Sequence, residues 1–125
     1  DRLLSRGLGD VYKRQMNVIG DVKNKTCVLV DDIVDTAGTI CNAAEALKNV
    51  GAKKVISYAT HPVLSGPALE RIEKSGLDEI IVTDTIPLSE EASKLKKIKI
   101  ISLDKTIAEA INRVNKEESV SAMFL

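Results

Sequence analysis

The stretch VLVDDIVDTAGT, from Val28 to Thr39, decides how this 125-residue chain folds. It overlaps the apolar, β-branched run Thr26–Val30, which is typical of a buried strand in a parallel sheet. The carboxylates Asp31 and Asp32 follow that strand directly, and a small polar run at 35–39 leads into a segment with helical spacing. A strand, a polar turn and a helix in this order predict the first unit of an α/β fold.

The chain beyond this stretch repeats the alternation of strand and helix. Apolar residues recur at helical spacing from Ile40 to Val50, and Gly51 stands where helices commonly end. Further strands are expected at 54–60, 79–84 and 99–103, further helices at 67–76 and 106–116, and a short helix or loop at 90–97. We therefore expect an α/β fold with a parallel sheet and helices on both faces. Ligands of such sheets bind beyond the carboxyl ends of the strands.

The composition argues against several classes of partner. Eighteen basic and eighteen acidic residues cancel, and aromatic residues make up only 2%, so we expect no nucleic acid. We expect no membrane either, because no apolar stretch approaches the roughly 20 residues of a span. Cys27 and Cys41 show no metal-binding or disulfide spacing, which predicts free thiols in a reducing, cytoplasmic compartment.

The polar run after the first strand suits a phosphate group. Backbone N–H groups at the start of a helix are unpaired and carry the positive end of the helix dipole. Ala37 and Gly38 keep bulky side chains away from these groups, while Thr36 and Thr39 add hydroxyl donors. The preceding carboxylates repel phosphate and suit instead the hydroxyls of a sugar or a hydrated divalent cation. The combination predicts a site for ribose 5-phosphate.

A purely structural interpretation of the same run is also open. Asp and Thr are ordinary turn and helix-capping residues, and an isolated DTAGT would more often be a cap than a ligand site. Asp31 and Asp32 favour the binding interpretation, because adjacent carboxylates at a strand end repel each other and stabilise nothing there.

The motif resembles the phosphoribosyl-pyrophosphate signature of type I phosphoribosyltransferases, in the form used by ribose-phosphate pyrophosphokinases. The resemblance extends to MNVIGDVKNKTCVLVDDIVDTAGTI, to YATHPVLSGPALERIEKSGLDEIIVTDTIPL and to the closing EESVSAMF. It covers residues 16–124 and is similar to that family's C-terminal region in order and spacing. The fold that it implies is type I phosphoribosyltransferase-like.

The resemblance implies an enzyme that transfers the diphosphoryl group of ATP to the 1-hydroxyl of ribose 5-phosphate, with Mg²⁺ as cofactor and a homo-oligomer as its assembly. Asp31 and Asp32 would face the ribose hydroxyls, and Asp31 would also approach the metal. The residues that would hold the 5-phosphate are Asp35, Thr36, Ala37, Gly38 and Thr39.

Functional roles are expected for some of the other polar residues and structural roles for the rest. The resemblance implies that Ser119, Val120 and Ser121 line a regulatory site for phosphate or ADP, whereas the sequence alone suggests a frayed tail. His61 follows a strand on the ligand side, and a structural, hydrogen-bonded histidine is favoured over a ligand. The run 83–85 is expected to be turn chemistry.

Residues 1–15 do not continue the pattern and are interpreted as a non-native leader. Residues 16–125 would then form the C-terminal, phosphoribosyltransferase-like domain of a two-domain enzyme. The family's basic Lys-x-Arg loop would fall near residues 5–7, where the chain has Ser5, Arg6 and Gly7 instead. We expect this chain alone to bind ribose 5-phosphate weakly, to lack catalytic residues of its own and to form no AMP from ATP.

Two alternatives from other classes remain. A type I phosphoribosyltransferase would share the loop but would need a base-binding hood, which the ending SVSAMFL does not offer. A non-catalytic regulatory protein that associates with a true synthase would keep the fold, and the sequence does not exclude it.

Overall fold

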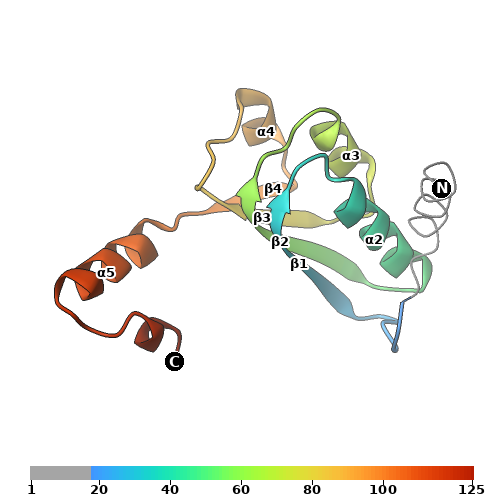
Figure 1. Ribbon diagram of the computed structural model, residues 1–125. Coiled ribbons are helices and arrows are strands. Elements are labelled where there is room, and N and C mark those ends of the chain that lie inside the picture. The colour runs from blue at the N-terminus through green and yellow to red at the C-terminus, as the bar shows by residue number, and fades with distance from the viewer. Residues whose placement is uncertain (1–17) are drawn as a thin grey trace, which may run out of the picture.

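The computed structural model describes residues 18–125, so the expectation of a leader at 1–15 lies outside the described residues. Four strands alternate with helices along the chain (Figure 1). The elements in chain order are β1 (Thr26–Val34), α2 (Gly38–Asn49), β2 (Lys54–Pro62), α3 (Ala68–Lys74), β3 (Glu79–Thr83), α4 (Glu90–Lys94), β4 (Ile98–Ile101), α5 (Asp104–Asn115) and the short 3-10 helix η1 (Ser121–Phe124). The predicted order of strands and helices is confirmed, with boundaries that differ by a few residues.

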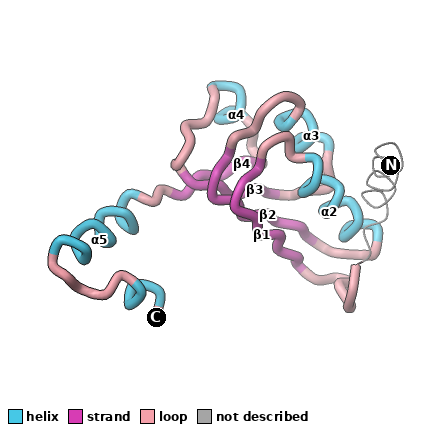
Figure 2. Tube along the Cα trace, viewed as in Figure 1, coloured by secondary structure: helices cyan, strands magenta, loops and turns pink. Residues whose placement is uncertain are grey.

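The four strands form one parallel sheet in the order β1-β2-β3-β4. A sheet whose strands follow one another in sequence order is wound in one direction, and right-handed crossovers then place every connecting helix on the same face. Helices α2, α3 and α4 lie accordingly on one face, as Figure 2 shows. The α/β class and the parallel sheet are confirmed. Helices on both faces are not found within residues 18–125, because the sheet never reverses its winding there.

Strand β1 differs from its prediction in length and in burial. It continues past Val30 to Val34, because Asp31 and Ile33 remain paired with Ala59 and His61 of β2. It is not buried on both faces, since the side chain of Val30 is 80% exposed. The second face of the sheet carries no helix in the part of the chain that the structure describes, and this leaves the apolar residues of that face open to solvent.

The core lies between the sheet and helices α2 and α3. Its largest fully buried side chains include Ile72 of α3, Ile80 of β3 and Val55 of β2. Cys41 of α2 is buried and Cys27 is partly buried, and both are free thiols, as expected. Burial of these apolar side chains packs α2 and α3 against the sheet, and this packing positions the turn between β1 and α2.

Helix α5 extends away from the sheet (Figure 1). It has no buried residue, and its apolar side chains Ile107, Ile111 and Val114 are between 52% and 67% exposed. The apolar face predicted for this helix therefore has no partner among residues 18–125. None of the helices in this range combines the length and the apolar character that a bilayer crossing requires.

Asp78 connects the turn before β3 to the rest of the fold. Its carboxylate accepts a hydrogen bond of 2.7 Å from the backbone of Val55 and lies 2.8 Å from the ammonium of Lys48. Partial burial alone would raise the pKa of Asp78, but the bonds from Lys48 and Val55 outweigh it and hold the pKa below its usual value. The ionised form is therefore the one that the folded chain stabilises.

Replacing Asp78 with alanine is expected to lower the free energy of unfolding at pH 7 by roughly 1–2 kcal/mol, because the N–H of Val55 loses its partner. The folded pKa is depressed, so this contribution is complete above the unfolded pKa and is lost as the pH falls through the folded one. Urea unfolding at pH 7 and at about pH 3 should show a difference between variant and wild type that shrinks in acid. Glu73→Ala removes an exposed carboxylate from α3 and should change little at either pH; an equal loss at both pH values for Asp78→Ala would contradict the account.

Candidate phosphate-binding site at the start of α2

The turn that joins β1 to α2 leaves the first N–H groups of the helix without a side-chain cap from residues 18–125. Ala37, the N-cap residue, is left-handed (φ 60°, ψ 9°) and makes no side-chain capping bond. The first turn of α2 holds no acidic residue. A left-handed residue other than glycine costs about 1–2 kcal/mol, a cost that is usually found where the geometry serves a purpose. Uncapped N–H groups and the helix dipole favour an anion at this position.

The loop that follows β2 supports this turn from one side. The backbone N–H of Ser65 donates to the carbonyl of Asp35 at 3.0 Å, and that of Leu64 donates to Val34 at 3.0 Å. The hydroxyl of Ser65 donates to the carboxylate of Asp35. The carboxylate of Asp35 is thus engaged with a neighbouring loop.

Asp31 and Asp32 lie inside β1 rather than after it. Successive side chains of a strand point to opposite faces, so the two carboxylates diverge instead of forming one pair. Both are exposed, and the backbone N–H of Asp32 donates to the carboxylate of Asp31 at 2.8 Å. Neither forms an ion pair within the described range. The two exposed carboxylates thus have no cationic partner within residues 18–125.

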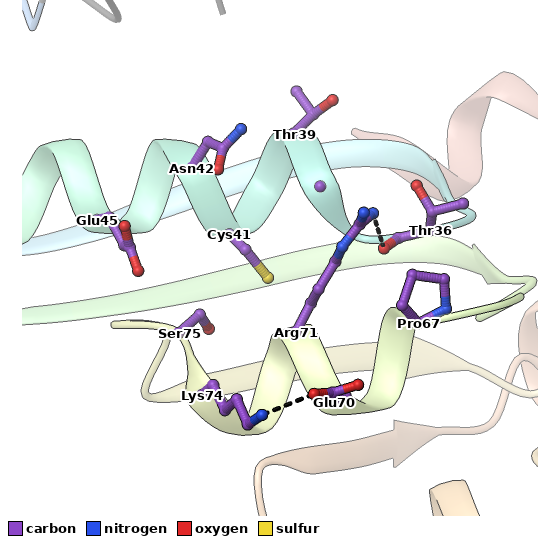
Figure 3. A pocket seen from close by; sticks show the side chains of 11 residues that line it. Thr36, Thr39, Cys41, Asn42, Glu45, Pro67, Glu70, Arg71, Lys74 and Ser75 are labelled. Carbon is purple, nitrogen blue, oxygen red and sulfur yellow. Dashed lines mark hydrogen bonds and ion pairs between the residues drawn. The ribbon is translucent and has the colours of Figure 1, made fainter. Parts of the chain in front are cut away.

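A cavity of about 730 Å³ lies between α2 and α3 and reaches the first turn of α2 (Figure 3). Arg71 crosses it from α3, and its guanidinium lies beside the turn, where Nη1 donates to the carbonyl of Thr36 at 3.0 Å. Glu70 and Lys74 pair with each other on the same helix at 2.6 Å. The sequence alone does not reveal Arg71 and Ser65 as neighbours of this turn, because nothing in their local pattern shows that they approach residues 30 or more positions earlier.

Cys41 points from α2 into this cavity, between Arg71 and Ser75 (Figure 3). Burial raises the pKa of the Cys41 thiol, and the nearby Ser75 hydroxyl and the charge of Arg71 offset only part of that effect. The thiol is therefore neutral at physiological pH and behaves as a small apolar side chain.

His61 is held at the carboxyl end of β2, one strand away from the turn. Its Nδ1 lies 2.8 Å from the hydroxyl of Thr85, which donates its own proton to the carbonyl of Thr60 at 3.1 Å. The expected structural hydrogen bond of His61 is present. Residues 84 and 85 form the expected turn, in which Asp84 accepts from the backbone of Leu103 at 2.9 Å.

Ser119 and Val120 lie between α5 and η1, and Ser121 is the first residue of η1; all three are far along the chain from the turn. The hydroxyls of Ser119 and Ser121 are 2.9 Å apart, and Arg113 donates to the carbonyl of Ser119 at 3.1 Å. Figure 1 shows this end of the chain beyond α5, away from the start of α2. The structure does not bring these residues together with the turn.

No cluster of three or more His, Cys, Asp or Glu side chains suited to a metal is found in residues 18–125. Mg²⁺ is usually held by one or two carboxylates together with water and the oxygens of a substrate. The exposed carboxylates of Asp31 and Asp32 fit that mode of binding and do not fit a cage made by protein alone.

Known proteins resemble the chain in sequence and in fold. A family model described as the phosphoribosyl synthetase-associated domain matches residues 8–125. A ribose-phosphate pyrophosphokinase of Coxiella burnetii is 66% identical over 110 residues, which are 88% of this chain and 34% of that protein. One of Haemophilus influenzae is 54% identical over 109 residues, which are 87% of this chain and 35% of that protein.

A solved structure agrees with these relatives. The phosphoribosylpyrophosphate synthetase of Mycobacterium smegmatis superposes with a TM-score of 0.76 and 43% identity, over 83% of this chain and 35% of that one. The chain thus spans about a third of the length of the proteins that it matches. It belongs to the phosphoribosyl synthetase-associated domain family.

Proposed function

We propose that the chain is the part of a ribose-phosphate pyrophosphokinase that holds ribose 5-phosphate, and that it corresponds to the C-terminal part of that enzyme. The whole enzyme transfers the diphosphoryl group of ATP to the 1-hydroxyl of ribose 5-phosphate and releases AMP. The observation that carries the proposal is the start of α2, where a left-handed Ala37 and a first turn without acidic residues leave backbone N–H groups free for an anion.

In this proposal the turn holds the 5-phosphate. The N–H groups of Gly38 and Thr39 and the hydroxyls of Thr36 and Thr39 are the donors, and Ala37 and Gly38 leave room for the phosphate oxygens. Asp31 and Asp32, which leave β1 on opposite sides, are proposed to accept from separate ribose hydroxyls. Transfer of a phosphoryl group depends mainly on positioning and charge neutralisation, so the role of this part is to fix the 1-hydroxyl in line with ATP.

Asp31 is also proposed as a ligand of Mg²⁺, because its carboxylate is exposed and makes no ion pair with a described residue. The metal would neutralise charge on the transferred group. Ser119, Val120 and Ser121 are proposed to line a regulatory site for phosphate or ADP, which the hydroxyls of Ser119 and Ser121 support by lying 2.9 Å apart. A homo-oligomer and a cytoplasmic location are proposed on the resemblance alone.

Calorimetric titration of the purified chain tests the proposal. Ribose 5-phosphate is expected to bind and ribose is not, because the phosphate supplies the charge that the turn recognises. Thr39→Val keeps the shape of the side chain but removes a hydroxyl donor, and it should weaken binding about tenfold, the equivalent of one charge-assisted hydrogen bond. Thr106→Val, on the exposed helix α5, is the matched control and should bind like the wild type. Equal binding of ribose and ribose 5-phosphate would refute the site.

A further inference from the structure

Arg71 is the side chain that joins α3 to the start of α2. Its Nη1 donates to the carbonyl of Thr36 at 3.0 Å, across 35 residues of sequence. The same atom lies only 3.3 Å from the position that a Cβ on Gly38 would occupy, so the guanidinium fits because residue 38 has no side chain. Figure 3 shows Arg71 extended across the cavity toward this turn. It is the only side chain in residues 18–125 that bonds to the run 36–39 from another element.

The positive charge of Arg71 lies beside the start of helix α2. The start of a helix carries the positive end of its dipole, where a cation is normally unfavourable. No ion pair of Arg71 is found within the described residues, and the nearest acidic residue along α3, Glu70, is engaged with Lys74 at 2.6 Å. Glu45 also lines the cavity, but Figure 3 shows it farther along α2, on the other side of Cys41. A guanidinium at a helix start suits a site that receives an anion.

The bond from Arg71 acts at the point where the turn changes direction. Thr36 precedes Ala37, the left-handed residue, and the orientation of the Thr36 carbonyl sets the plane of the peptide that ends in the N–H of Ala37. The Asp35 side of the turn is supported by Ser65, through its backbone N–H at 3.0 Å. Without Arg71, no side chain from another element in the described chain would bond to the Thr36 carbonyl.

We propose that Arg71 is a positioning residue for the phosphate-binding turn. It holds the carbonyl of Thr36 so that the N–H groups of residues 37–39 converge on one anion, and it places a positive charge beside that anion. The proposal rests on the proposed function for the identity of the anion as a sugar phosphate. The part of the proposal that concerns the geometry of the turn is independent of the proposed function, because that geometry is a property of the chain without ligand.

Two measurements on the full 125-residue chain test the proposal. In titrations with ribose 5-phosphate, Arg71→Ala is expected to weaken binding at least tenfold, and guanidinium ion at about 10 mM should restore part of the affinity by filling the vacated position. In the ligand-free chain, hydrogen exchange of the Cys41 amide, which bonds to the carbonyl of Ala37 at 3.1 Å, should become faster. Lys74→Ala, which removes another cation from the same cavity, should change neither quantity.

The outcomes separate the two proposals. If the wild type binds no ribose 5-phosphate but Arg71→Ala still speeds exchange at Cys41, the positioning role stands and the proposed substrate fails. If the wild type binds and Arg71→Ala binds equally with unchanged exchange, the positioning role is wrong. Should Arg71→Ala lose helical circular dichroism, Arg71→Lys replaces it: it keeps the charge and most of the stem, and it should still speed exchange because its single ammonium lacks the reach of the guanidinium.

Discussion

Valine at position 38 is expected to weaken the binding of ribose 5-phosphate by roughly 100-fold, about 3 kcal/mol, without unfolding the chain. Gly38 is the first residue of α2, and the left-handed Ala37 precedes it. A branched side chain there would cover N–H groups that the phosphate oxygens must approach. It would also displace Arg71, whose Nη1 lies 3.3 Å from the position of the new Cβ. Loss of about two charge-assisted hydrogen bonds accounts for the magnitude.

Calorimetric titration measures this effect, and circular dichroism checks that the variant is folded. Ala108→Val is the control, because it places the same side chain on the exposed helix α5, away from the start of α2. It should bind ribose 5-phosphate like the wild type. If Gly38→Val remained folded and bound within threefold of the wild type, the phosphate would have to lie somewhere other than the start of α2.

Truncation of Ile72 to alanine is expected to lower the free energy of unfolding by about 2–5 kcal/mol. Ile72 is fully buried in α3, against the core formed with α2 and the sheet. The cost combines the lost burial of its side chain with the cavity left behind. For a small domain this is a large share of the total stability. Urea unfolding, followed by circular dichroism, measures it.

Ile111→Ala makes the same chemical change on α5, where the side chain is 65% exposed. It should alter the free energy of unfolding by no more than about 0.5 kcal/mol. Equal destabilisation by the two variants would mean that α5 is buried in solution, by a surface that residues 18–125 do not provide. The comparison therefore also tests whether the apolar face of α5 is free.

Much of the fold could be predicted from local pattern. The run Thr26–Val30, the helical spacing that ends at Gly51 and the later strands each carry their own periodicity, so the order of elements and the parallel sheet followed without any distant contact. The ends of the individual strands and helices were harder to predict. The polar residues Asp31 and Asp32 suggested that the first strand had ended, whereas pairing with β2 extends it to Val34. Ladder pairing with a neighbouring strand outweighed the local preference of Asp for turns.

Some features of the candidate site could likewise be predicted from the sequence, and others could not. The run from Asp35 to Thr39 could be predicted as a phosphate turn from local sequence, because such a turn needs small and hydroxyl-bearing residues next to one another along the chain. Whether Asp31 and Asp32 act together was not visible in the sequence, since only the strand pleat shows that adjacent carboxylates diverge. Burial around Ile72 likewise depended on the packing of α3 and not on its composition.

The sequence of VLVDDIVDTAGT was enough to predict a strand, a turn and a helix, because each depends on residues within a few positions of one another. It could not show that every crossover helix lies on one face of the sheet, which follows from the strand order. Nor could it show that Arg71 reaches the carbonyl of Thr36. That contact joins residues 35 positions apart, and only the packing of α2 and α3 over one sheet brings them within hydrogen-bonding distance.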